Sequence, residues 1–236
     1  MLHNGGVSSN PRWDVAESVA DAVLDRYPGD VHAIGVYGSL AHGDDTEGSD
    51  VDLVVVTYRA GPGPQPASRR ISGVIVQCGV ISVDEYLAHA RTLSTTWPLA
   101  ADQYVTTKPI FDPKNWHDRL RDAHLGRLAQ ADSQEFTALA REAWCPAAAT
   151  LARALRLAGG HETDGALLTL GEARLAAALV EGLLTRTYFR GGAEAVSRTG
   201  LGSADPGELS RRLATQAEEL AKRGQPVDGT PADLLR

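Results

Sequence analysis

The first half of the chain carries short apolar runs at the spacing of a small sheet. Residues 33–37 form an apolar run typical of a buried strand, and residues 50–57 form another after a polar excursion. Residues 71–81 alternate weakly and are rich in β-branched side chains, so we expect them to pair with the 50–57 strand. Residues 105–111 predict one further strand.

Helical patterns and a loop separate these runs. Asn10 is a favourable N-cap and Pro11 a favourable first helical residue, which together predict a helix over residues 11–26. Ser82 has the character of a cap for another helix. Residues 60–69 are rich in glycine and proline and therefore predict a loop.

The second half of the chain changes to helical patterns rich in Ala, Leu and Arg. Alanine-rich faces favour close helix packing, so we expect a small bundle. The expected helices are residues 116–129, 132–157, 167–187 and 206–223. The predicted fold is thus α/β plus α: a mixed sheet with flanking helices, then a C-terminal helical bundle, as domains 1–115 and 116–236.

Candidate chemistry begins directly after the first apolar run. Gly38 lets the backbone turn sharply and lets another group approach it closely. Ser39 supplies a hydroxyl and, with the N–H groups that follow, an anion cradle at the start of a helical turn.

Two acidic residues open the next strand. Asp50 and Asp52 lie two positions apart, and the period of a strand places both carboxylates on one face. Two neighbouring carboxylates repel each other, and a hard cation such as Mg²⁺ carrying phosphates is the usual reason that they stay together. The acidic excursion before them, with Asp44, Asp45 and Glu47, is expected to be a solvated loop.

Gly38-Ser39 followed, after ten residues, by Asp50-Val51-Asp52 resembles the signature of the polymerase-β nucleotidyltransferase superfamily. The runs AIGVYGSL, WPLAADQY, TKPIFD and ALLTLGEARLAAALVEGLL further resemble the kanamycin nucleotidyltransferase family of aminoglycoside O-nucleotidyltransferases. The resemblance implies Mg²⁺-dependent transfer of a nucleoside monophosphate from an NTP, with ATP the expected donor, to an aminoglycoside hydroxyl. It also implies a homodimer with sites shared between subunits.

The resemblance assigns roles to individual residues. Asp50 and Asp52 are the implied catalytic metal ligands, and Gly38 with Ser39 is expected to hold the phosphates. His42 falls where the family has a phosphate-contacting arginine, and either phosphate binding or simple exposure suits a histidine there.

The chain departs from the family pattern at several positions. A third carboxylate is replaced by Gln77, which offers an amide oxygen to Mg²⁺ but no charge, and a nearby lysine is replaced by Ile75. On the 132–157 helix, the family's catalytic glutamate falls on Pro146 and a lysine on Thr150. Glu142, one turn before Pro146, either replaces the missing base or lies on a solvated helix face.

The amino-acid composition limits the kinds of molecule that the protein is expected to bind. The net charge of −7 and the lack of a Lys/Arg cluster argue against a nucleic-acid partner. An acidic protein suits a cationic small substrate, although the same charge also keeps proteins soluble. The two cysteines lack metal-type spacing and no apolar run could span a bilayer, so we expect a cytoplasmic protein that does not bind membranes.

These observations leave three hypotheses. The first is a Mg²⁺-dependent nucleotidyltransferase acting on a small polar, cationic acceptor, which the Asp50–Asp52 pair favours. The second is a repurposed enzyme of antibiotic or secondary metabolism on the same fold. The third is a non-catalytic binding protein; Gln77, Ile75 and Pro146 favour the second and third.

Overall fold

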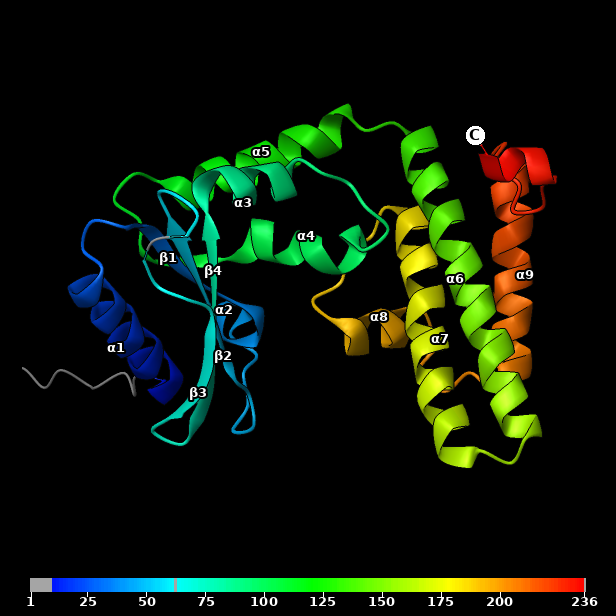
Figure 1. Ribbon diagram of the computed structural model, residues 1–236, viewed down its shortest axis with the longest axis horizontal. Helices are drawn as coiled ribbons and strands as arrows, with labels where there is room; N and C mark the ends of the chain where they lie inside the picture. Colours follow the sequence, from blue (N-terminus) through cyan, green and yellow to red (C-terminus); the bar gives the residue numbers. More distant parts are fainter. Residues whose placement is uncertain (1–9, 62, 236) are drawn as a thin grey trace, which may run out of the picture. The chain divides into compact units, whose positions relative to one another are not determined.

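The computed structural model describes residues 10–61 and 63–235, which fall into two compact units (Figure 1). The first unit contains the residues up to Thr92 together with Asp102–Arg127. The second contains Leu93–Ala101 together with the residues from Leu128 onwards. No helix in the described part of the chain combines the length and the apolar character that crossing a membrane requires.

The first unit is built on a mixed five-stranded sheet of order β3-β4-β2-β1-β5. β2 runs antiparallel to β1 and parallel to β4. The expected pairing with the aspartate strand is confirmed for β4, whereas Ile71 belongs to β3 and pairs with Val74 across a turn. The strands are β1 (Val31–Tyr37), β2 (Val51–Thr57), β3 (Ala67–Ile71), β4 (Val74–Ser82) and β5 (Lys108–Phe111).

Two sequence expectations about the sheet were wrong in part. Residues 67–71 form the edge strand β3 instead of continuing the loop. The four residues from Ala67 onwards are exposed, so the strand needs no apolar pattern to form. Only Lys108–Phe111 of the expected 105–111 strand is extended, because Val105 and Thr106 complete the helix α4 (Trp97–Thr106).

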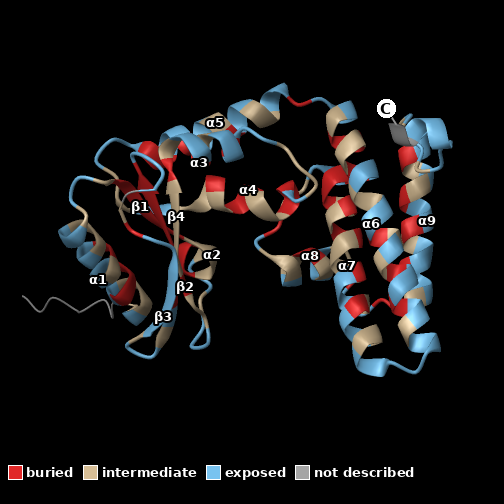
Figure 2. Cartoon of the chain, viewed as in Figure 1, coloured by how far each residue is buried: buried red, intermediate tan, exposed pale blue. Residues whose placement is uncertain are grey.

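Helix α1 (Pro11–Arg26) packs against one face of the sheet (Figure 1). The Asn10 side chain accepts a hydrogen bond from the Arg12 N–H, which confirms the predicted N-cap. The helix buries a short stripe of small apolar residues against alternate residues of β1 and β2, such as Ile34 and Leu53. Figure 2 shows how the buried positions concentrate on these strands.

The first unit also contains the short helix α2 (Gly38–His42), α3 (Val83–Ala90), the end of α4 (Trp97–Thr106), and α5 (Trp116–Gln130). Ser82 caps α3 in a capping box with Glu85, as expected. α5 approaches β1 closely, since a Cβ at Gly35 would lie 2.6 Å from Nε2 of His117. This close packing explains why α5 belongs with the sheet, so the expected boundary at residue 115 does not coincide with the observed division.

In the second unit, α6 (Ser133–Gly159), α7 (Thr163–Thr185) and α9 (Pro206–Lys222) run side by side, with α8 (Gly192–Arg198) and a 3₁₀ turn, η1 (Pro231–Leu235). The bundle and its long helices agree with the sequence prediction, whereas α8 and α4 were not anticipated. Small side chains fill its core, as at Ala140 and Ala177. Trp97 packs edge-on against Phe136 with ring centroids 5.0 Å apart, which places the start of α4 with the bundle.

Candidate nucleotide and metal site

Gly38 forms the sharp turn between β1 and α2. Its φ is 71°, in the left-handed region that favours glycine. A Cβ at this position would lie only 2.6 Å from Oδ2 of Asp52, so a side chain here would collide with that carboxylate. Gly38 is therefore needed both for its conformation and for the close approach of Asp52. Ser39 follows it inside α2.

The two aspartates meet at the edge where β2 begins. Asp52 lies within β2, and Asp50 stands immediately before its first residue instead of inside the strand as expected. Val51 and Leu53 point into the core under α1, so Asp52 faces the opposite side, as strand alternation predicts. Burial, and then the charge of Asp50, raises the pKa of Asp52 to about 6.

Asp52 has one neighbour on each adjacent strand. Tyr37 of β1 pairs with it in the antiparallel register, and Gln77 of β4 pairs with it in the parallel register. The pKa of the Tyr37 hydroxyl is raised by burial, then by Asp52 and Asp50. Tyr37 thus experiences the same concentrated negative charge.

Gln77 contacts the other aspartate directly. Its Nε2 donates a hydrogen bond to Oδ2 of Asp50 at 2.5 Å. The sequence expectation that Gln77 faces the aspartates is in line with this geometry, although the contacting atom is the amide nitrogen. A half-turn of the amide group would present the carbonyl oxygen to a cation at the same place.

The residues at this edge fit a magnesium ion. Mg²⁺ is usually held by one or two carboxylates, with water and substrate phosphates completing its shell. Within the described residues, no three or more His, Cys, Asp or Glu side chains are grouped so as to hold a metal. A cation at this edge would meet Asp50 and Asp52, with the amide of Gln77 beside them. It would relieve the repulsion from Asp50, which adds to burial in raising the pKa of Asp52.

The loop that leads to Asp50 is anchored to the start of α1. The Asn10 amide donates to both oxygens of Asp45, at 2.9 and 3.1 Å, and Arg12 donates to the carbonyl oxygens of Glu47 and Ser49. The Asp45 side chain is only 8% exposed. The expectation of a solvated excursion was therefore wrong for Asp45, which fixes the path of the chain toward Asp50.

His42 ends α2 and contacts a residue that sequence reasoning missed. Its Nε2 lies 2.9 and 3.1 Å from the two carboxylate oxygens of Asp102, on α4. The two side chains are 14% and 6% exposed, so His42 is not the freely exposed residue that was one of the two expectations. No local pattern pointed to Asp102, because α4 itself was not predicted.

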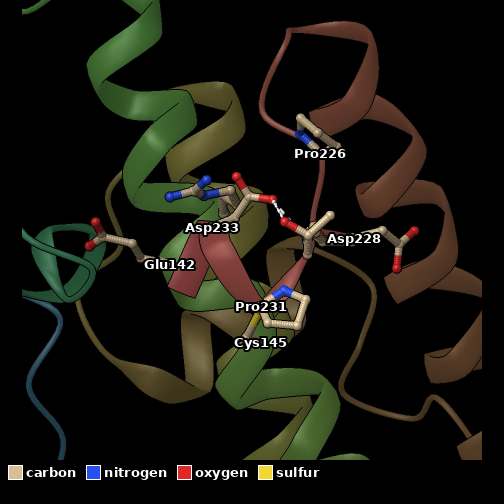
Figure 3. Close-up of a pocket in the computed structure, with 10 residues that line it drawn as sticks. Glu142, Cys145, Pro226, Asp228, Pro231 and Asp233 are labelled. Carbon is tan, nitrogen blue, oxygen red and sulfur yellow. Dashed lines mark hydrogen bonds between the residues drawn. The ribbon is translucent and has the colours of Figure 1, made fainter. Parts of the chain in front are cut away.

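Glu142 lies in the second unit, on α6, beside a pocket of about 880 Å³. The C-terminal segment forms the other wall, and in Figure 3 the Glu142 side chain extends away from Asp228 and Asp233. The lining residues are Arg141, Glu142, Cys145, Pro226, Val227, Asp228, Gly229, Thr230, Pro231 and Asp233. Hydrogen bonds from the side chain and the backbone N–H of Thr230 lower the pKa of Asp233, so this wall carries negative charge.

Pro146 lies one turn after Glu142, inside a helix that continues through it. Proline has no N–H, so the backbone carbonyl of Glu142 cannot receive the usual i+4 hydrogen bond from it. The Glu142–Pro146 segment therefore combines one carboxylate with an interrupted hydrogen-bond ladder.

Comparison with known proteins supports the assignment of the first unit. Residues 16–89 match the nucleotidyltransferase domain family. Aminoglycoside nucleotidyltransferases (4') from Staphylococcus aureus and from a Bacillus species are each 28% identical over 111 residues. The match spans 46% of this chain and 43% of each relative, less than half of either protein.

Among solved structures, a nucleotidyltransferase-like protein from Exiguobacterium sibiricum is similar over 88% of this chain and 75% of its own, with 13% identity and a TM-score of 0.43. That likeness is too weak to add to the assignment. The family match covers the Gly38 turn and both aspartates, and the curated relatives agree with it. Residues 16–89 therefore match a nucleotidyltransferase domain, and part of the chain is similar to aminoglycoside nucleotidyltransferases (4').

Proposed function

We propose that this protein transfers a nucleoside monophosphate from an NTP, with ATP the expected donor, to a hydroxyl of a small polar acceptor. The observation that carries the proposal is the Asp50–Asp52 pair beside the Gly38 turn, with the pKa of Asp52 raised to about 6. Two neighbouring carboxylates without a cationic partner destabilise the free protein, and a bound cation would offset their repulsion.

The reaction assigns a task to each residue. The acceptor oxygen bonds to the α-phosphorus as the bond to the bridging oxygen breaks, pyrophosphate leaves, and the hydroxyl proton passes to a base. Asp50 and Asp52 would hold Mg²⁺, which when bound neutralises charge on the phosphates. Gly38 and Ser39 would contact the phosphates, His42 would add a further donor, and Gln77 would support the metal site. Glu142 is the proposed base.

An aminoglycoside is the proposed acceptor. The printed names of the curated relatives describe aminoglycoside nucleotidyltransferases (4'), and aminoglycosides are polycations. The pocket beside Glu142 also carries Asp228 and Asp233, and the whole chain has a net charge of −7, so a cationic acceptor is electrostatically favoured. We propose that the reaction takes place in the cytoplasm, because NTPs are supplied there.

We also propose that the protein works as a homodimer, as the family resemblance implies. Size-exclusion chromatography with light scattering at micromolar concentration tests this directly. A mass of one chain, 25.0 kDa, would contradict it.

A second candidate function is nucleotide binding without transfer. The observation that favours it is the hydrogen bond from Gln77 to Asp50, because an amide in place of a third carboxylate removes charge from the metal site. Loss of a carboxylate at the Pro146 position points the same way.

The deciding experiment is mass spectrometry of the protein incubated with Mg²⁺, mixed NTPs and a panel of aminoglycosides. An acceptor that gains the mass of one nucleoside monophosphate, with release of pyrophosphate, supports transfer. The adduct should disappear in Asp52→Asn and persist in Asp118→Asn, which changes a 63% exposed aspartate on α5. Mg²⁺-dependent nucleotide binding with no adduct on any acceptor supports the second candidate instead.

A further inference from the structure

Asp102 is a buried carboxylate that the proposed reaction does not itself use. The residue is 4% exposed and lies on α4. A carboxylate taken out of water destabilises the fold unless hydrogen bonds and an opposite charge compensate it. The partners of Asp102 therefore indicate what it is for.

The partners of Asp102 come from two elements. His42 Nε2 contacts both carboxylate oxygens, and the Thr106 hydroxyl contacts Oδ2 at 3.2 Å. A carboxylate only accepts hydrogen bonds, so Nε2 of His42 carries the proton at this contact. The contact fixes the orientation of the imidazole ring.

His42 ends the same short helix that Gly38 begins. Gly38 packs against Asp52, and four residues of α-helix span about 6 Å, so the backbone of His42 lies one turn from the aspartate edge. A helix of five residues is too short to be stable without tertiary support. Asp102 provides such support at the C-terminal end of α2.

We propose that Asp102 is a positioning residue, which holds His42 and the end of α2 in the arrangement that receives the phosphates of the nucleotide. The inference rests on the proposed nucleotide-binding function. Asp102 itself does not contact the nucleotide; it restricts the imidazole to one orientation before binding, which lowers the ordering that binding requires.

The test measures MgATP affinity by calorimetry in four proteins: the wild type, Asp102→Asn, His42→Gln and the double variant. Asparagine keeps the size of the side chain but removes its charge. Each single variant should weaken MgATP binding by about tenfold, the loss expected for one hydrogen bond to a charged group. The double variant should bind no more than about twofold worse than either single variant, because both changes break the same contact.

Transfer kinetics give a second readout wherever an acceptor has been found. Asp102→Asn should raise the KM for ATP and leave the KM for the acceptor unchanged. Thr106→Val removes the hydroxyl contacts to the carboxylate of Asp102, at 3.2 Å, and to its backbone carbonyl oxygen, at 2.8 Å. It should weaken MgATP binding by about threefold, and it keeps the test informative if Asp102→Asn does not fold. Asp118→Asn is the matched control and should bind MgATP like the wild type.

Two results would overturn the inference while leaving the proposed function intact. One is wild-type MgATP affinity in Asp102→Asn and in Thr106→Val. The other is a double variant whose loss is the full product of the single losses, since Asp102 would then act independently of His42. A wild-type protein that binds no Mg-nucleotide would instead overturn the proposed function, and the inference with it.

Discussion

Each unit places one unfavourable residue inside a regular element, and the two cases differ in what could compensate them. In β2, Asp52 places a half-buried carboxylate beside Asp50, and its pKa rises to about 6. In α6, Pro146 interrupts the hydrogen-bond ladder of a long helix. A cation would offset the first cost by screening the charge. No ligand can restore the missing N–H of a proline.

The comparison shows that a destabilising residue indicates function only when a bound ligand would offset the destabilisation. The Asp50–Asp52 pair fits this criterion, because both carboxylates face the same edge as the Gly38 turn. Pro146 does not, although the sequence resemblance aligns it with a family carboxylate. The proposed metal ligands are thus both present in the first unit, and Glu142 is the proposed base in the second.

The largest expected effect comes from changing the proposed metal ligands of the first unit. Asp52→Asn should lower kcat/KM for nucleotidyl transfer by about 10³-fold, because it removes a charged ligand of the metal. Steady-state rates of pyrophosphate release would measure it. Asp118→Asn should keep the wild-type rate. A loss below tenfold in Asp52→Asn would show that the pair is not the metal site.

Glu142→Gln tests the proposed base on α6. If Glu142 is the base, kcat should fall by about 10²-fold while the KM for ATP stays constant. Glu162→Gln, a change of another exposed glutamate of the second unit, is the control. Equal rates in both variants would mean that Glu142 belongs to a solvated face of α6.

Pro146→Ala should stabilise the second unit. Restoring the backbone N–H and the helix propensity of alanine should raise the free energy of unfolding by about 1–3 kcal/mol. Denaturant unfolding followed by circular dichroism measures the change, with the exposed Ala152→Gly on the same helix as a destabilising reference. A destabilised Pro146→Ala would show that the bundle packs around the proline.

The Asp52 carboxyl predicts an unusual pH dependence of stability. Its folded pKa, about 6, lies above its ordinary value of 3.8, so the folded state binds the proton more tightly. The stabilisation that this carboxyl contributes to the folded state is fully present below pH 3.8 and is lost as the pH rises through about 6. Allowing for solvent screening of this half-buried group, the loss is about 1–2 kcal/mol.

Unfolding in EDTA at several pH values between 4 and 8 measures this loss, and Asp52→Asn should abolish it. Mg²⁺ should reduce it in the wild type, because the cation stabilises the ionised carboxylate. An identical pH profile in Asp52→Asn would contradict the assignment of the shift to Asp52.

The smallest effect concerns His32, whose two ring nitrogens are buried without a hydrogen-bond partner. Burial, then the charges of Lys114 and Arg119, lowers its pKa below 6.5. Its contribution to stability is therefore present above pH 6.5 and lost as the pH falls through the lowered value. His32→Phe should stabilise the first unit by about 1 kcal/mol and more at acidic pH. A uniform gain across pH values would show that packing alone is responsible.

Local sequence patterns were sufficient to predict the parts of the site that are close in sequence. The Gly38 turn, the shared face of Asp50 and Asp52 and the Asn10 cap all follow from backbone conformation and strand period. The pairing of the aspartate strand with the β-rich run after it was also predicted, whereas Gln77 as the residue beside the aspartates came from the family resemblance.

The tertiary structure alone decided which residues from distant segments meet. Asp102 contacts His42 across sixty positions of sequence, through a helix with no clear apolar stripe. Asp45 is held by Asn10 and Arg12, and the C-terminal segment forms one wall of the pocket beside Glu142. Turn chemistry and side-chain period act over a few residues, so a sequence encodes them directly. Contacts between distant polar residues leave no periodic signal, and they are fixed only when the chain packs.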